Sequence, residues 1–418
     1  MRHGEAARGR ALARRGAARV EPSKALPVAP KAVSKPLEKG GFLDTEGVRE
    51  ATAVVIADVH ARPWDVLKRA ELASLLSKLE ADGTDTRIVT KAGGSAANTA
   101  RGLSRGFGVK AGLLGAVGDD QWGNLFKQAM RDARVDVSNL SEKPGATGRC
   151  ACFVEEGSGQ RTMRTCMQDA VRLEAREILG RLGDRDNQVV GSNPLRGASW
   201  VLVPGYAFYG DGLVDALLSA AAEANCKVAL ALASFEIVRS FGTEIEQLLR
   251  SGRIAAVFAN EDEARELTKY YEKTRLDEAE SSNMSKKKRK AQSGPRDSSP
   301  ETAAEDALDV LQRWSKECVA VVTLGDKGCV ARRWDPYSQS RVYCGAEEDI
   351  VAQDSTGAGD LFVSGFLYGL LRGAPLDECA ELGCLAGAAA TQSVGAEVSD
   401  EGWAWVRDRR EESDILVL

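Results

Sequence analysis

Short runs of apolar residues alternate with longer amphipathic stretches from about residue 54 to 267. The apolar runs are AVVIA, AGLLGAV, RCACFV, WVLVPG, KVALALA and IAAVFA, and helical repeats such as DGLVDALLSAAAEA and IEQLLRSG lie between them. Strands that are apolar throughout are typical of a parallel sheet covered on both faces. The pattern therefore predicts an α/β fold, a doubly wound sheet with right-handed crossovers.

The same alternation returns near the C-terminus. A helix over ALDVLQRW precedes strands over CVAVVTLG, GCVARRW and RVYCGAEE, and helices are predicted over 358–372, 376–393 and 401–410. Residues 271–302, which include SSNMSKKKRKAQSGPRDSSPE, are polar and without periodicity, so a disordered surface insertion is predicted there. Residues 1–41 are rich in arginine and alanine, which indicates a disordered or targeting extension and leaves a cytoplasmic or a plastid location open.

Composition narrows the class of partner. The 418 residues are 43% hydrophobic and 28% charged with a net charge of -5, which gives no overall attraction to nucleic acid or an anionic membrane. No apolar run approaches the ~20 residues that span a bilayer. Nine scattered cysteines, two histidines and no CxxC argue against a zinc site and fit reduced thiols in an intracellular protein.

The run DSTGAGD, residues 354–360, opens directly into the apolar helix LFVSGFLYGLL. Gly357, Ala358 and Gly359 leave their backbone N–H groups accessible, and the first N–H groups of a helix attract anions such as phosphate. Asp360 beside that anion suits a base acting on a hydroxyl. The alternative is an ordinary capped helix start.

Three further segments carry candidate chemistry. In AGGSAANTARG, Gly93 and Gly94 permit close backbone approach and Asn98 can bind a hydroxyl, although tight helix packing also explains them. In NEDE, Asn260 and Glu263 suit either a capping box or a hydrated Mg²⁺. In TLGDKG, the relevant positions fit either a plain turn between strands or a ligand contact at the sheet edge: Thr323, Gly325 and Gly328.

The order GGxxxN, NxxE, TxGxxG, DxTGAGD resembles the ribokinase (PfkB) family of carbohydrate and nucleoside kinases over about residues 51–410. The segments AGGSAANTARGLSRGFGV, SFEIVRS, FANEDEA and SGFLYGLL are most similar to a plant and algal branch related to adenosine kinase. The resemblance implies a ribokinase-like three-layer α/β/α domain with a small β lid. It also implies a kinase that uses ATP and Mg²⁺ to phosphorylate a hydroxyl of a sugar, a nucleoside or a related small molecule.

Roles carried over from the resemblance follow the motifs. Asp360 is the implied base, and the anion hole for the transferring phosphoryl group is formed by Gly357, Ala358 and Gly359. The acceptor hydroxyls would be bound by Gly93, Gly94 and Asn98. Asn260 and Glu263 would organise Mg²⁺ through water, and the nucleotide site would be lined by Asn260, Thr323, Gly325 and Gly328. Asp354 and Thr356 match positions that help hold a monovalent cation, such as K⁺, in many members.

The first strand departs from the family pattern. Members usually carry a glycine and an asparagine before an aspartate that binds the sugar, whereas this chain reads TAVVIADVHARPWD. Asp58 is the best candidate for that aspartate, or it is simply a polar residue at a strand end.

The lid is predicted in parts near 54–64 and 148–168, where RCACFVEE and QRTMRTC flank a Gly-Ser-Gly turn, and pairing of lids would give a homodimer. A non-catalytic PfkB-like binding or regulatory protein is the alternative function.

Overall fold

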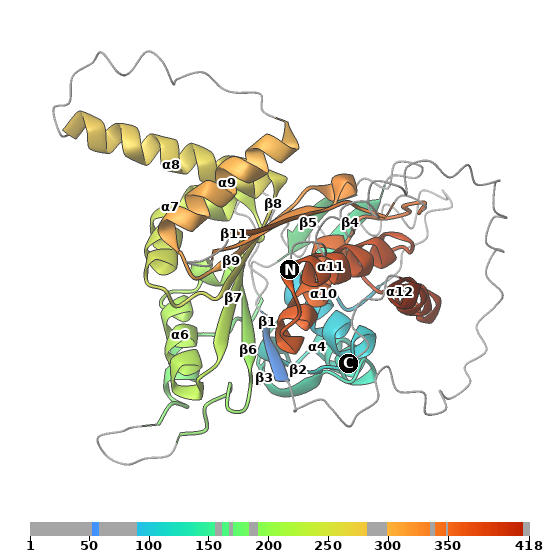
Figure 1. Ribbon diagram of the computed structural model, residues 1–418. Helices are drawn as coiled ribbons and strands as arrows, with labels where there is room; N and C mark the ends of the chain where they lie inside the picture. Colours follow the sequence, from blue (N-terminus) through green and yellow to red (C-terminus); the bar gives the residue numbers. More distant parts are fainter. Residues whose placement is uncertain are drawn as a thin grey trace, which may run out of the picture. The chain divides into compact units, whose positions relative to one another are not determined.

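The structure, a computed structural model, describes residues 52–57, 90–154, 161–166, 170–183, 191–281, 299–334, 339–347 and 350–412 (Figure 1). All of them belong to one unit, Phe42–Leu418. The extension expected over residues 1–41 lies outside the described residues. Among the described helices, none combines the length and the apolarity that crossing a bilayer requires.

A nine-stranded mixed sheet forms the centre of the described fold, in the order β11-β10-β9-β8-β7-β6-β1-β2-β3. Neighbours from β3 to β9 pair in parallel, and β10 and β11 add an antiparallel edge. The strands are β1 (Thr52–Ala57), β2 (Lys110–Gly118), β3 (Asp136–Lys143), β6 (Trp200–Pro204), β7 (Lys227–Ala231), β8 (Ala256–Asn260), β9 (Val319–Thr323), β10 (Cys329–Trp334) and β11 (Gln339–Cys344).

Helices cover both faces of this sheet (Figure 1). One face carries α3 (Ser95–Arg101), a π-helical turn (Gly102–Gly106), α4 (Gln121–Asp132), α10 (Ala358–Arg372), α11 (Leu376–Thr391) and α12 (Asp400–Glu412). The other carries α5 (Ala175–Leu179), α6 (Leu213–Ala224), α7 (Phe235–Arg250), α8 (Glu261–Ser281) and α9 (Pro300–Trp314). The predicted three-layer α/β/α architecture is confirmed.

Strand β6 shows why the strands had to be apolar throughout. Trp200 and Leu202 pack into the core under α10, whereas Val201 and Val203 pack into the core under α6 and α7. Successive strand residues point to opposite faces, so a strand with two buried faces has no polar position.

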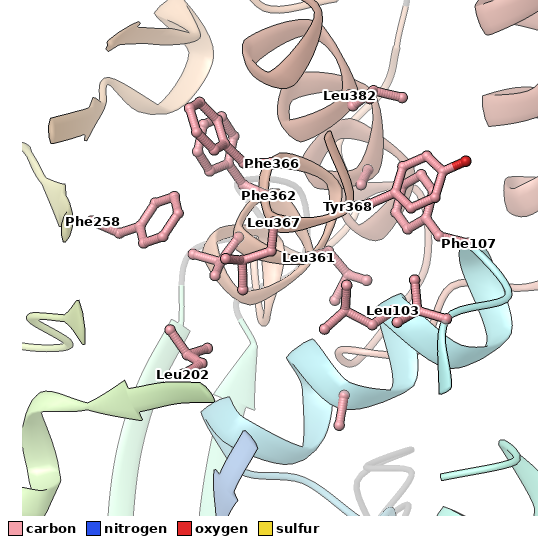
Figure 2. Packing of buried hydrophobic residues seen from close by; sticks show 14 of the residues in the cluster. Leu103, Phe107, Leu202, Phe258, Leu361, Phe362, Phe366, Leu367, Tyr368 and Leu382 are labelled. Carbon is pink, nitrogen blue, oxygen red and sulfur yellow. The ribbon is translucent and has the colours of Figure 1, made fainter. Parts of the chain in front are cut away.

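Helices α10 and α11 form a tightly packed hairpin that fixes the DSTGAGD segment against the sheet. A Cβ on Gly365 would lie 2.1 Å from the Leu382 carbonyl oxygen, so only glycine permits this approach. Phe366 meets Phe258 of β8 edge-on, with ring centroids 5.4 Å apart. Figure 2 shows Phe366 beside Phe362, and Leu202 below Leu361 and Leu367. The buried remainder of α10 therefore anchors the start of this helix.

The expected disorder of residues 271–302 is wrong at both ends. Helix α8 continues to Ser281, and Tyr271 packs edge-on against Trp314 of α9, with ring centroids 6.2 Å apart. Helix α9 begins at Pro300, where Ser299 accepts a hydrogen bond from the Thr302 amide. The contact of Tyr271 with Trp314 is a tertiary interaction that the polarity of the local sequence does not reveal. Residues 282–298 lie outside the described part.

The lid expectation is partly wrong. Residues 54–57 belong to β1, which lies in the main sheet between β6 and β2, because an apolar run fits a strand with two buried faces. The second predicted part does form a separate two-stranded antiparallel sheet, β4 (Arg149–Val154) with β5 (Arg161–Cys166). Residues 58–64, including Asp58, lie outside the described residues.

Candidate active site

The N-terminal turns of α3 and α10 meet at the carboxylate of Asp360. Ser95 donates its hydroxyl hydrogen bond to Asp360 Oδ1 at 2.6 Å, and Asn98 Nδ2 donates to Oδ2 at 2.8 Å. Thr99 Oγ1 donates to the Asp360 carbonyl oxygen at 3.1 Å. Both carboxylate oxygens act as acceptors, which is the role of an ionised carboxylate. The predicted base is thus held in a fixed orientation.

The start of α10 has the features of an anion site. Gly357 precedes the helix with φ 77°, and an added Cβ there would lie 2.3 Å from Ala396 Cβ. The amide of Leu361 donates to the Gly357 carbonyl at 2.9 Å, which is the bond that opens the regular helical pattern. Ala358 donates only a long 3.3 Å bond to Ser355. A Cβ on Gly359 would meet no atom within 4 Å, which leaves open space for a phosphoryl group.

Asp354 shapes the turn that leads into this helix. Its side chain is 1% exposed and accepts from Thr356 N at 2.8 Å, from Thr356 Oγ1 at 2.6 Å and from Gly395 N at 2.8 Å. These bonds explain the residue as the brace between the turn and the end of α11. The monovalent cation expected at Asp354 and Thr356 stays a prediction.

The GGxxxN segment lies against the base. Gly94 precedes α3 with φ 106°, and its carbonyl accepts from the Asn98 amide at 2.9 Å. Gly93 is exposed, and an added Cβ would meet no atom within 4 Å. Asn98 is 5% exposed, and its side chain bonds to Asp360 and to Arg101. The structure therefore shows Asn98 as a partner of the base, and its predicted contact with an acceptor stays a prediction.

Asn260 and Glu263 form a complete capping box at the start of α8. Asn260 N and Nδ2 donate to the two Glu263 oxygens, and Glu263 N donates back to Asn260 Oδ1, each at 2.9 Å. Glu263 is 3% exposed, so direct ligation of a metal would break this arrangement. The oxygen donors fit a hydrated Mg²⁺ reached through water, since Mg²⁺ keeps several of its waters.

Thr323 lies beside Asn260, because these two residues are partners at the carboxyl ends of β9 and β8. Gly325 and Gly328 shape the following turn with φ 61° and 85°, and Leu324 N donates to the Gly328 carbonyl at 2.8 Å. A Cβ on Gly328 would lie 2.0 Å from the Cys344 carbonyl oxygen, whereas one on Gly325 would meet nothing. Gly328 is thus required by the turn, and Gly325 faces open space at the carboxyl end of β9, the edge at which open α/β sheets generally bind ligands.

Sequence reasoning missed Ser95, Thr99, Arg101 and Glu397. Ser95, Asn98 and Thr99 occupy positions i, i+3 and i+4 of one helix, and this spacing was the available signal. Arg101 donates from Nη2 to Asn98 Oδ1 at 2.6 Å and from Nη1 to Glu397 Oε1 at 2.8 Å. Burial lowers the pKa of the Arg101 guanidinium, and the Glu397 and Asp360 carboxylates oppose that shift.

The ribokinase-like sheet defines the class of protein, and the open start of α10 and the Asp360 carboxylate lie where the sequence predicted an anion site and a base. A sequence model described as pfkB family carbohydrate kinase matches residues 69–402, and the chain belongs to that family. It is therefore a small-molecule kinase that acts on a sugar or a nucleoside, with ATP and Mg²⁺ as the cofactors that the family implies.

One curated relative matches most of the chain, and another matches a single segment. An adenosine kinase of Schizophyllum commune is 29% identical over 361 residues, covering 85% of this chain and 91% of that protein. An inositol 3-kinase of Oryza sativa subsp. japonica is 41% identical, but over 85 residues that cover 20% of each chain.

Solved structures show the same architecture. Adenosine kinase from Sinorhizobium meliloti has a TM-score of 0.64 and 25% identity, over 87% of this chain and 100% of that one. A probable sugar kinase from Rhizobium etli has a TM-score of 0.63 and 25% identity, over 88% and 99%. Ribokinase from Cryptococcus neoformans in complex with ADP, at 19% identity and a TM-score of 0.56, shares the fold.

Proposed function

We propose that the chain transfers the γ-phosphoryl group of ATP to a ribose hydroxyl of a nucleoside, with adenosine as the first candidate. The main support for phosphoryl transfer is the Asp360 carboxylate, which Ser95 and Asn98 hold beside the open first turn of α10. The choice of a nucleoside is supported by the curated adenosine kinase that matches over 85% of this chain, whereas similarity to inositol 3-kinase is confined to one segment. A probable sugar kinase matches in structure as well as an adenosine kinase does, so the acceptor panel must include sugars.

The chemistry divides between the base and the helix start. Asp360 would take the proton of the attacking hydroxyl, a role worth about 10²–10⁴ in rate. The first amides of α10 would stabilise charge on the phosphoryl group as it moves, and phosphoryl transfer depends mainly on such positioning and charge stabilisation. Mg²⁺ bound with ATP would neutralise phosphate charge, and Asn260 and Glu263 would hold its water shell.

A monovalent cation and the small β4–β5 sheet would also contribute to the reaction. Asp354 and Thr356 would bind K⁺ beside the anion turn, in addition to bracing it, so turnover should be higher in KCl than in choline chloride. The β4–β5 sheet would close over the acceptor and exclude water. The same sheet is the proposed contact of a homodimer, which sedimentation of wild type and of an Arg149→Glu variant would test.

The test is ADP formation from ATP and Mg²⁺ with a panel of nucleosides and sugars. Adenosine should stimulate ADP release, and Asp360→Asn should lower turnover about 10²–10⁴-fold while calorimetric ATP binding is kept. If a sugar stimulates and no nucleoside does, the kinase stands and the nucleoside assignment fails. If no acceptor raises ADP release above the Asp360→Asn background, catalysis itself is refuted, and a binding or regulatory role takes its place.

A further inference from the structure

Arg101 is a buried cation one step removed from the base. Its residue is 6% exposed, and its two terminal nitrogens bond different partners, Asn98 and Glu397. We propose that Arg101 is a positioning residue for the kinase reaction: it locks the Asn98 amide in the orientation that presents Nδ2 to Asp360. The proposal rests on the proposed function, because it assigns Asp360 as the base.

Hydrogen-bond donors and acceptors decide the orientation of the Asn98 amide. A guanidinium can only donate hydrogen bonds, whereas the Asn98 amide has a donating end and an accepting end. Arg101 Nη2 at 2.6 Å can therefore bond only to Oδ1, which turns Nδ2 toward Asp360 Oδ2 at 2.8 Å. The reversed amide would set an oxygen against the carboxylate and an NH₂ group against the guanidinium. Both contacts would then be repulsive, so Arg101 selects one of two orientations.

Packing alone does not explain a cation at this position. Arg101 Nε is buried and has no hydrogen-bond partner among the described residues, although burial of an incompletely paired charge is costly. The side chain also borders a cavity of about 250 Å³, with Leu361, Val398 and Trp403 among its walls. Charged residues also line this cavity, Arg105, Asp132 and Glu397 among them, and the cavity gives a substituted side chain room. The cation is better explained by its contact with Asn98.

Glu397 holds the other end of the guanidinium. It lies in the segment between α11 and α12 and is half-exposed. Its Oε1 accepts from Arg101 Nη1 at 2.8 Å, and its Oε2 lies 3.7 Å from Lys91 Nζ. Lysine at position 101 could reach Asn98 or Glu397 but could not bond both in a fixed fork. Arg101→Lys should therefore restore only part of what Arg101→Met loses.

Arg105 provides a matched control. It lies one turn further along, and its Nη2 bonds Asp400 Oδ1 at 2.7 Å, so it also joins the α3 region to the C-terminal segment through an arginine–carboxylate pair. Its side chain is 45% exposed, and its bonds do not reach Asn98. Arg105→Met should show the effect of losing an arginine–carboxylate pair between these segments. It should not show the effect of releasing Asn98 and Asp360.

The test is a double-mutant cycle with ATP, Mg²⁺ and adenosine, or whichever panel acceptor is turned over. Arg101→Met should lower kcat about 10–100-fold, with the KM for ATP and the unfolding temperature close to those of Arg105→Met. In an Asn98→Ala background, Arg101→Met should have less than about a twofold further effect, because the amide through which it acts is gone. Multiplying effects would show that Arg101 does not act through Asn98, and the proposal would be wrong.

A second readout needs no acceptor. The Asn98 side-chain amide signals, identified in a ¹⁵N spectrum by their absence from Asn98→Ala, should exchange slowly with solvent in the wild type. They should exchange faster in Arg101→Met and Arg101→Lys but not in Arg105→Met. Unchanged exchange in both Arg101 variants overturns the proposal even if kcat falls. If no acceptor is turned over, the proposed function fails, and the amide signals still decide whether Arg101 fixes Asn98. Arg101→Lys also serves if the methionine variant does not fold.

Discussion

Two glycines of the DSTGAGD turn have different physical tasks. Gly357 has a positive φ, and a Cβ added there would clash with Ala396, so both the backbone conformation and this neighbour require glycine. Gly359 is helical and faces open space, so nothing in the described protein excludes a methyl group there. The absence of a side chain at Gly359 is explained by a ligand that approaches the first turn of α10.

Gly359→Ala should therefore separate folding from function. We expect an unchanged unfolding temperature and a fall in kcat of about tenfold or more, since one donor to developing charge is worth about 10²–10³ and the methyl group would displace the phosphoryl group from several. Gly345→Ala is the control, because its added Cβ also meets no atom within 4 Å and it lies after β11. Equal turnover in the two variants would count against an anion site at α10.

Three thiols lie close together at the β10–β11 edge, and we expect one of them to be reactive. Cys329 and Cys344 are cross-strand partners, and Cys384 of α11 lies 3.9 Å from Cys329, sulfur to sulfur. Hydrogen bonds from Cys329 and Cys384 lower the pKa of Cys344. Iodoacetamide at pH 6 should alkylate Cys344 well above the rate seen in guanidinium, where its thiol regains an ordinary pKa. Peptide mass spectrometry measures the label, which a Cys329→Ala/Cys384→Ala variant should lose. A faster reaction in guanidinium would refute the assignment.

Several residue roles could not be predicted because they depend on contacts between distant segments. The sequence indicated both a capping box and a magnesium role for Asn260 and Glu263, and only coordinates show the reciprocal bonds that occupy both Glu263 oxygens. Asn98 was predicted to face an acceptor, yet it bonds Asp360 because α3 packs beside α10. Arg101 carried no motif signal, since its partner Glu397 lies 296 residues further along the chain.

At the scale of elements, an ion pair joins helix α8 to helix α7. Glu266 of α8 accepts from Arg239 of α7 at 2.9 and 3.3 Å. Burial acts to raise the pKa of Glu266, but the hydrogen bond and charge of Arg239, with help from Lys269, leave that pKa below its ordinary value of 4.5. A carboxyl with a depressed pKa stabilises the fold above its unfolded pKa and loses that effect as pH falls through the folded pKa.

Glu266→Gln should accordingly be less stable than wild type at pH 7, by about 1–2 °C in unfolding temperature for a largely surface pair. The difference should persist down to about pH 4.5, the ordinary value, and shrink below it as wild-type Glu266 becomes protonated. Glu272→Gln, at an exposed position on the same helix, is the control. A difference between the Glu266 and Glu272 variants that stays constant to acid pH would mean that the ion pair is not its source.

Elements with a strong repeat were predictable, and those defined by tertiary pairing were not. Helix α10 and strand β4 match their predicted bounds, since a capped apolar helix and an apolar run carry their own signal. Strand β3, DVSNLSEK, was missed because an edge strand with exposed positions is polar and exists through its ladder with β2. Helix α8 was cut short in the prediction because its second half is largely polar.

In the whole chain, the sheet joins segments that the sequence separates widely. Asp360, the proposed base, accepts a hydrogen bond from Asn98 of α3, and the proposed nucleotide edge combines Asn260 with Thr323. A ligand that contacts these segments binds only the folded state, so it must raise the stability of the fold by mass action. The same linkage can reveal the metal, because Mg²⁺ and ATP would bind together.

Mg²⁺ with ATP at about 100 times its dissociation constant should add about 2.7 kcal/mol, or several °C in the unfolding temperature of Asp360→Asn, which is expected to consume the nucleotide only slowly. Excess EDTA should remove most of that shift, since the uncompensated phosphates of ATP would bind weakly. Glu263→Gln should reduce the Mg²⁺-dependent part relative to its own ligand-free protein, a comparison that cancels the loss of the capping box at α8. A shift that survives EDTA in full would exclude Mg²⁺ from the nucleotide site. A Mg²⁺-dependent shift that Glu263→Gln leaves intact would place the metal away from Asn260 and Glu263.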